Sequence, residues 1–201
     1  ISGDWSGPGS GWQTYAASAA WDIGAVDGAL TVYGEYRDAA GNISAALDDI
    51  TLDTLPPTAG FVINGDDALT NDPSVVLNST SVDAAQMQFS NDGTSWSAWL
   101  AYSDTYAWTL VPGDGGHTVF AQYQDTAGNL TTDNHVIIVD ATPPDASFVI
   151  NGGAAITNDL GVTLENSSLE AVSMQFSNDG TSWSAWVAYA SSQAWTLVAG
   201  D

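Results

Sequence analysis

Short runs of β-branched and aromatic residues alternate with clusters of turn residues, and no helical period persists beyond one turn. The runs recur about every ten residues, which is typical of an all-β domain. Within 117–124, Val119, Ala121 and Tyr123 alternate with Phe120, Gln122 and Gln124, and we expect the first set to face the core. The pattern predicts seven strands in the middle of the chain, at 59–64, 74–79, 85–90, 95–102, 105–111, 117–124 and 130–139.

Two kinds of turn signal separate these strands. Asn91-Asp92-Gly93 predicts a tight hairpin, because Asn, Asp and Gly tolerate the positive φ of primed turns, and the same residues recur at 178–180. The pairs Pro56-Pro57 and Pro143-Pro144 cannot donate to a ladder and keep the preceding residues extended. We therefore place domain junctions at these proline pairs.

The sequence repeats itself with a period of 87 residues. FVINGDDALTND begins at Phe61 and returns as FVINGGAAITND at Phe148, and MQFSNDGTSWSAW begins at Met87 and returns unaltered at Met174. Residues 61–114 and 148–201 are identical at 35 of 54 positions. A more diverged copy precedes them, because 12–60 matches 99–147 at 18 of 49 positions.

The period sets the domain organisation. Residues 1–54 form the back part of one repeat, 55–141 a complete repeat, and 142–201 the front part of another. Seven short strands in about 87 residues predict tandem immunoglobulin-like antiparallel β-sandwiches. Neither partial copy should bury a complete core alone, so we expect either a section of a longer array or chains that complete each other.

Charge narrows the range of partners. The chain has 24 acidic residues against a single basic one, Arg37, for a net charge of −23. Such a charge repels phosphate backbones and anionic lipid headgroups, so we expect no nucleic-acid partner. No run approaches the ~18 apolar residues that a membrane span requires, so we also expect no membrane insertion. Apolar residues make up 44% of the chain, enough to bury a core, and the absence of cysteine excludes disulfides and thiolate metal sites.

The sequence offers little for catalysis. His117 and His135 are the only histidines, and neither recurs in the other copies. Carboxylates are abundant, but they recur at the repeat spacing instead of marking one specialised cleft. We therefore expect a protein that is not an enzyme.

Aspartate outnumbers glutamate 21 to 3, which suits both turns and oxygen-rich calcium sites. No continuous EF-hand loop exists, so a calcium site would have to combine separate loops. Metal ligation and turn capping both remain open for the recurrent aspartates. The recurrent positions are Asp38 and Asp125 in DAAGN and DTAGN, Asp53 and Asp140 before the proline pairs, Asp27, Asp114 and Asp201 in the Gly-Asp turn region, and Asp72 and Asp159.

The segments TVYGEYRDAAGNIS (31–44), ITLDTLPP (50–57), TVFAQYQDTAGNLT (118–131) and IIVDATPP (138–144) resemble the bacterial Ig-like repeats of large cell-surface and secreted adhesins. The resemblance implies a rod-like tandem array outside the cell, with calcium between consecutive domains in some members. Its motifs implicate the following positions as calcium ligands: Asp38, Asp53, Asp125 and Asp140, with Asn42 and Asn129 in addition.

A repeated aromatic set suggests a different function. Exposed aromatic faces are common platforms for sugar rings or other proteins, and three tryptophans per repeat exceed what a sandwich core needs. On a regular strand, Trp96 and Trp99 would point to opposite faces. The candidate ligand-binding residues are Trp96, Trp99 and Tyr102, with their equivalents Trp183, Trp186 and Tyr189.

Three functions follow. The first is a bacterial extracellular or cell-surface stalk, shaft or filament, stiffened by calcium at its junctions, with neighbouring repeats of the same or identical chains as partners. The second is a carbohydrate- or surface-binding module that uses the aromatic face on glycans or a host surface. The third is a self-assembling filament subunit in which the incomplete terminal repeats complement each other head to tail.

Overall fold

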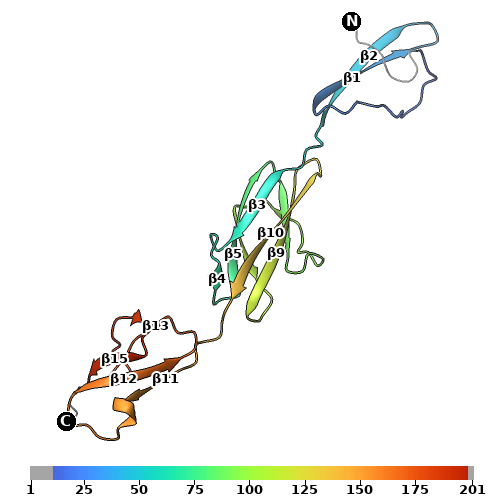
Figure 1. The fold of residues 1–201 in the computed structure, drawn as a ribbon. Helices are drawn as coiled ribbons and strands as arrows, with labels where there is room; N and C mark the ends of the chain where they lie inside the picture. The colour runs from blue at the N-terminus through green and yellow to red at the C-terminus, as the bar shows by residue number, and fades with distance from the viewer. Residues whose placement is uncertain (1–10, 199–201) are drawn as a thin grey trace. The chain divides into compact units, whose positions relative to one another are not determined.

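The computed structural model describes residues 11–198. Within that range the regular elements are β-strands and one short 3₁₀ turn (Figure 1). The chain divides into two compact units. Of the described residues, the first unit comprises those up to Leu69 together with 73–112 and 116–138, and the second comprises 70–72, 113–115 and those from Val139 onward. Within the described range no helix is long and apolar enough to cross a membrane.

The repeat at 55–141, here called the central repeat, is a sandwich of two sheets. A three-stranded sheet has the order β3-β5-β8, and a five-stranded sheet has the order β4-β10-β9-β6-β7. This arrangement confirms the predicted all-β, immunoglobulin-like fold. The strands are β3 (Thr58–Ile63), β4 (Leu69–Thr70), β5 (Ser74–Val82), β6 (Gln86–Ser90), β7 (Leu100–Ala101), β8 (Thr105–Thr109), β9 (Gly115–Gln124) and β10 (Leu130–Val139).

Strand β4 was not predicted, and it departs from the antiparallel pattern. The Ile138 amide donates to the Ala68 carbonyl at 3.1 Å, and the Asp140 amide donates to the Thr70 carbonyl at 2.9 Å. The bonds advance in the same direction along both strands, so β4 runs parallel to β10. A strand of two residues is too short to produce a periodic sequence signal.

The core of the central repeat lies between its two sheets. The rings of Phe61 and Phe89 meet edge-on, 6.1 Å between centroids. The Tyr123 hydroxyl lies 2.9 Å from Ser79 Oγ, which joins β9 of one sheet to β5 of the other. Val119, Ala121 and Tyr123 have no exposed surface, so the predicted inward face of β9 is confirmed.

The segment 95–102 is mostly loop, and the tight hairpin predicted at Asn91-Asp92-Gly93 is wrong in detail. Only β7 (Leu100–Ala101) is extended, and the chain reverses through a longer loop in which the Ser97 amide donates to the Phe89 carbonyl at 2.9 Å. Of the three predicted turn residues, Gly93 alone has positive φ. Asp92 Oδ1 accepts the Thr94 and Ser95 amides at 2.7 and 2.6 Å, and these bonds replace a ladder.

The two partial repeats reproduce parts of this fold at the 87-residue period. Near the N-terminus, β1 (Gly28–Arg37) and β2 (Ile43–Leu52) form an antiparallel pair equivalent to β9 and β10. After the central repeat, five strands correspond in order to β3 and β5–β8. They are β11 (Ala146–Ile150), β12 (Gly161–Ser168), β13 (Ser173–Met174), β14 (Val187–Ala188) and β15 (Ser192–Thr196), and the 3₁₀ turn η1 (Asn151–Gly153) follows β11. We call these the first and third repeats.

Candidate functional site

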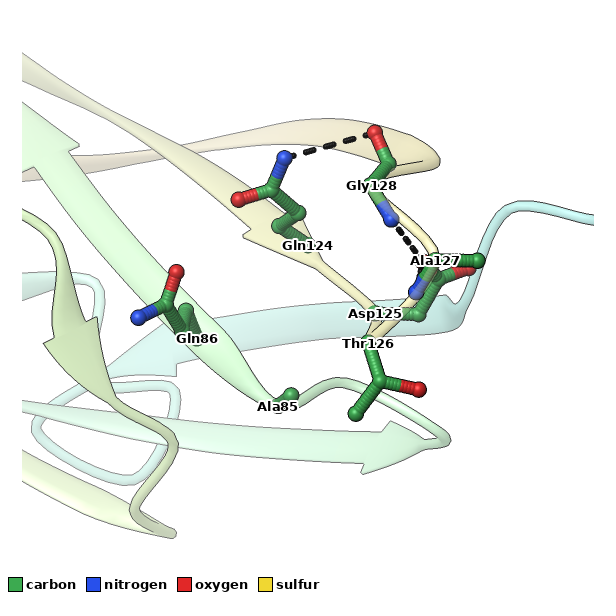
Figure 2. Close-up of a pocket in the computed structure, with 7 residues that line it drawn as sticks. All are labelled: Ala85, Gln86, Gln124, Asp125, Thr126, Ala127 and Gly128. Carbon is green, nitrogen blue, oxygen red and sulfur yellow. Dashed lines mark hydrogen bonds between the residues drawn. The ribbon is translucent and has the colours of Figure 1, made fainter. Parts of the chain in front are cut away.

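The D-x-AGN loop between β9 and β10 is organised around one carboxylate. Asp125 Oδ1 accepts the amides of Ala127, Gly128 and Asn129 at 2.9, 2.7 and 2.9 Å. Asp125 Oδ2 accepts the Asn129 side-chain amide at 2.9 Å. Gly128 has φ +99°, which explains the glycine in the motif, and its carbonyl accepts the Gln124 side chain (Figure 2). The loop lines a hollow of about 520 Å³ with Ala85 and Gln86.

The same loop holds the chain that enters the central repeat. The Asn129 side-chain amide donates to the Asp53 carbonyl at 3.0 Å, and the Thr131 hydroxyl donates to the Pro57 carbonyl. Asn129 therefore fastens the linker to the Asp125 loop, which explains why asparagine closes the D-x-AGN motif.

The hydrogen bonds favour an ionised Asp125. Burial acts to raise the pKa of Asp125, a residue that is 4% exposed, but the hydrogen bonds from the Asn129 side chain and from the three amides outweigh this effect. The pKa of Asp125 therefore lies below its usual value. A carboxylate offers about four acceptor positions, and four N–H donors already point at this one.

The first repeat has an exposed version of this loop. Asp38 Oδ2 accepts the Asn42 side-chain amide at 2.7 Å, and Oδ1 accepts the Asn42 backbone amide at 2.8 Å. These two bonds, the side-chain one first, hold the pKa of Asp38 below its usual value. In both copies the described contacts are those of turn capping.

A second aspartate in each of these two repeats accepts hydrogen bonds from the linker that follows the repeat. Asp114 Oδ1 accepts the Ala141 amide at 2.9 Å, and Asp114 Oδ2 accepts the Thr142 hydroxyl. One period earlier, Asp27 Oδ1 accepts the Thr54 amide at 3.1 Å and the Thr54 hydroxyl at 2.9 Å. These bonds, with the Thr142 side chain contributing most, lower the pKa of Asp114. The third predicted copy, Asp201, lies outside the described residues.

Sequence reasoning found the recurrence of Asp27 and Asp114 but not their role as linker acceptors. The available signal was a threonine in each linker, at Thr54 and at Thr142, displaced by one position between the two copies. That displacement hides the relation in an ungapped alignment. The contacts show it because the carboxylate reaches a backbone amide and a neighbouring hydroxyl in both copies.

The predicted calcium ligands are not gathered into one cage in this structure. Asp53 Oδ1 accepts the Leu55 amide at 3.2 Å, and Asp140 has an exposed side chain beyond the end of β10. Residues 11–198 contain no group of three or more His, Asp or Glu side chains that could hold a metal ion. The donors around Asp38 and Asp125 are N–H groups, which do not fit a cation. Calcium at Asp38, Asp53, Asp125, Asp140, Asn42 and Asn129 stays a prediction from the sequence.

The aromatic candidates lie differently in the two later repeats. In the central repeat Trp96 and Tyr102 are half-buried, and Trp99 is 36% exposed. The Tyr102 hydroxyl donates to the Ser79 carbonyl at 3.3 Å. The strand that would have turned Trp96 and Trp99 to opposite faces is absent there, because the segment is a loop.

In the third repeat the equivalent residues line an apolar groove of about 500 Å³. Trp183 and Trp186 are 55% and 65% exposed, and Tyr189 is half-buried. The Tyr189 hydroxyl donates to the Asn166 carbonyl at 3.3 Å, as Tyr102 does to Ser79 one period earlier. The groove also includes Phe148 and Phe176, which the sequence analysis did not select. Their equivalents in the central repeat, Phe61 and Phe89, are buried.

The histidines do not form a catalytic pair. His135 Nε2, on β10, lies 3.1 Å from Asp66 Oδ1, and the centroid of its ring lies 6.1 Å from that of Phe61. His117 lies on β9, away from this pair in sequence. Neither contact includes a nucleophile.

No family model and no curated protein matches this chain. Among solved structures, one similar chain is a tetra-tandem repeat in the extending region of a large adhesion protein. It is 20% identical with a TM-score of 0.37, and the match covers 86% of this chain and 49% of that chain. This chain thus spans about half the length of the one that it matches.

Proposed function

We propose that this chain is a non-enzymatic structural and adhesive repeat protein of the bacterial cell surface or extracellular space. Its consecutive Ig-like repeats form part of a stalk, shaft or filament. The observation that carries the proposal is the repeated fastening of the linkers. An aspartate accepts the linker amide and threonine hydroxyl in two successive copies, Asp27 with Thr54 and Asp114 with Thr142.

The mechanism is mechanical. A linker whose amide and side chain are bonded to the adjacent repeat samples fewer backbone conformations than a free one. The proline pairs after Asp53 and Asp140 restrict φ and remove donors, which limits the linkers further. Sequence and hydrogen bonds together reduce bending at each junction without a metal ion.

Small-angle scattering of the 201-residue chain tests this proposal. We expect Asp114→Ala to reduce the average maximum dimension and broaden the distance distribution, because the second linker loses both bonds. Asp67→Ala is the matched control, since it removes the same charge from an exposed loop position. Identical distributions for the chain and for Asp114→Ala would contradict the role of this contact in stiffening.

A second candidate function uses the aromatic face of each complete repeat. Trp99 is 36% exposed in a repeat whose core is filled, so its exposure does not depend on missing strands. A sugar ring could stack on such a side chain. Tryptophan fluorescence of the chain against a glycan panel, with Trp99→Ala as the matched variant, tests this function. A response that Trp99→Ala leaves unchanged would argue against it.

A further inference from the structure

The turn after β3 and the turn after β11 each contain an Asn-Gly pair. Asn64-Gly65 and Asn151-Gly152 are the two Asn-Gly sequences of the chain. In both pairs each residue has positive φ, +50° and +70° in the central repeat and +48° and +65° in the third. Positive φ at both central residues is that of a type I′ turn, which favours asparagine followed by glycine. The backbone of the turn therefore selects this pair.

An Asn-Gly pair is also chemically labile, because a glycine has no side chain to hinder attack by its own nitrogen. The glycine nitrogen forms a bond to Cγ of the asparagine, and the bond between Cγ and Nδ2 breaks. The proton of the glycine nitrogen leaves with Nδ2 as ammonia. Water then opens the succinimide ring to aspartate or to isoaspartate, in which the main chain is lengthened through Cγ.

Hydrogen bonds hold both reacting groups in the central repeat. Asn64 Oδ1 accepts the Val76 amide at 2.8 Å, and the Asn64 amide donates to the Val76 carbonyl at 2.8 Å. The Gly65 amide donates to Asn78 Oδ1 at 2.8 Å. Strand β5 thus fixes the asparagine side chain and the glycine nitrogen separately. Ring closure removes the proton from the Gly65 nitrogen, so the bond to Asn78 must break first.

The third repeat has the same arrangement with a different acceptor. The Thr163 amide donates to Asn151 Oδ1 at 2.9 Å, and the Gly152 amide donates to Glu165 Oε2 at 3.0 Å. Both partners lie on β12, one period after their counterparts on β5. The two repeats therefore share an oxygen acceptor for the glycine amide, carried by an amide in one and by a carboxylate in the other.

We propose that Asn64 is a latent deamidation site whose reaction is held off by Asn78. Glu165 does the same for Asn151 in the third repeat. Exclusion of water does not explain the protection, because both glycines are exposed and both asparagines are only half-buried. A glycine N–H must leave its acceptor before its nitrogen attacks, and one such hydrogen bond corresponds to a factor of about ten in an equilibrium.

The position of Asn64 gives the reaction a structural consequence. The Asp66 amide donates to the Ile63 carbonyl at 3.0 Å across the turn, and Asp66 Oδ1 lies 3.1 Å from His135 Nε2 on β10. A longer main chain at Asn64 would displace both contacts. This role goes beyond the proposed function, because it concerns the chemical persistence of a repeat and not its linkers.

Mass spectrometry of the folded 201-residue chain, stored in mildly alkaline buffer and then digested with pepsin, tests the proposal at each asparagine. We expect Asn78→Ala to raise the deamidation rate at Asn64 about tenfold and to leave Asn151 unchanged. Glu165→Ala should have the reverse effect, so each variant is the control for the other. In concentrated urea both asparagines should react faster, at rates that these substitutions do not change.

Conservative variants separate this role from a general loss of stability. Asn78→Asp and Glu165→Gln keep an oxygen acceptor and should keep the slow rates. Tyr123→Phe removes the bond to Ser79, away from the turn, and should leave the rate at Asn64 unchanged. An unchanged rate beside either alanine substitution, or equal rates in the folded chain and in urea, would overturn the proposal. A slower reaction of the third-repeat asparagine in Glu165→Gln would also overturn it, because the carboxylate would then act as a base.

Discussion

The central and third repeats share long identical stretches but use them in different environments. Phe89 and Phe176 occur in the same MQFSNDGTSW segment, yet Phe89 has no exposed surface and Phe176 is half-buried. The Asp92 and Asp179 turns and the Trp108–Asn91 and Trp195–Asn178 bonds are reproduced almost unchanged. Local hydrogen bonding is therefore the same in the two repeats, whereas the burial of this phenylalanine differs between them.

The largest expected difference between the two repeats concerns this phenylalanine. Phe89→Ala removes a ring that contacts Phe61, Tyr106, Trp108 and Tyr123, and should destabilise the central repeat by about 3–5 kcal/mol. Phe176→Ala should cost about 1–2 kcal/mol, because its ring is already partly in water. Hydrogen exchange in denaturant, read on peptides from each repeat, separates the two effects. Equal losses would contradict the difference in burial between the two rings.

The second largest expected effect is a loss of stability of the central repeat at high pH. Burial raises the pKa of Tyr123 to about 12, against an ordinary value near 10. The raised value means that the folded state keeps the proton longer than the unfolded state does. The stability of the central repeat should be unaffected below about pH 10 and fall by about 1.4 kcal/mol per pH unit up to about pH 12.

Tyr123→Phe supplies the control for this pH dependence. It should cost some stability at neutral pH, because the Ser79 bond is lost, and should flatten the curve above pH 10. A slope that persists in Tyr123→Phe would assign the effect to other groups. Urea unfolding at a series of pH values measures both quantities.

A smaller difference is expected between the two D-x-AGN loops. Asp125→Ala leaves three amides and the Asn129 side chain without an acceptor inside a packed repeat, so the melting midpoint of that repeat should fall by several degrees. Asp38→Ala should have less effect, because water can replace an acceptor in the exposed loop. Circular dichroism melts of the chain and both variants measure this. Equal falls in the melting midpoint for the two variants would contradict a role for burial of the loop.

Low pH should reduce the stability of both repeats by protonating aspartates that accept hydrogen bonds. The pKa of Asp125 is lowered in the folded state, so its contribution to stability is present above about pH 4 and is lost as pH falls further. Asp92 and Asp179 have lowered pKa values for the same reason, mainly the amides of Ser95 and Ser182. We expect both repeats to lose stability below about pH 4, and Asp125→Ala to lessen the loss only in the central repeat.

The smallest expected difference is between calcium and monovalent salt. The carboxylates of the D-x-AGN loops already accept N–H donors, so both salts should raise the melting midpoint alike by screening the acidic surface. A specific ligand at a hundredfold excess over its dissociation constant would add about 2.7 kcal/mol. If calcium stabilised the chain by that much more than monovalent salt does, and not in Asp53→Ala and Asp140→Ala, the junctions would have to rearrange to bind it.

Much of the fold could be predicted because its signals are local. The alternation in β9 specified which side chains face inward, and Val119, Ala121 and Tyr123 are all buried. Prediction failed for β4, which has two residues, and for 95–102, where aromatic residues of high strand propensity lie in a loop held by Asp92. There a side-chain acceptor competes with the ladder, and propensity does not register the competition.

The sequence alone determined the 87-residue period, the strand-rich class and the positions of the inward side chains, because each depends on neighbouring residues. Only the tertiary structure decided that the Asp125 carboxylate is filled by N–H donors, and that Asp114 fastens the next linker. It also decided that the Tyr123 hydroxyl meets Ser79 of the other sheet. These properties depend on what lies across the sheet, and the residues that determine them are distant in sequence.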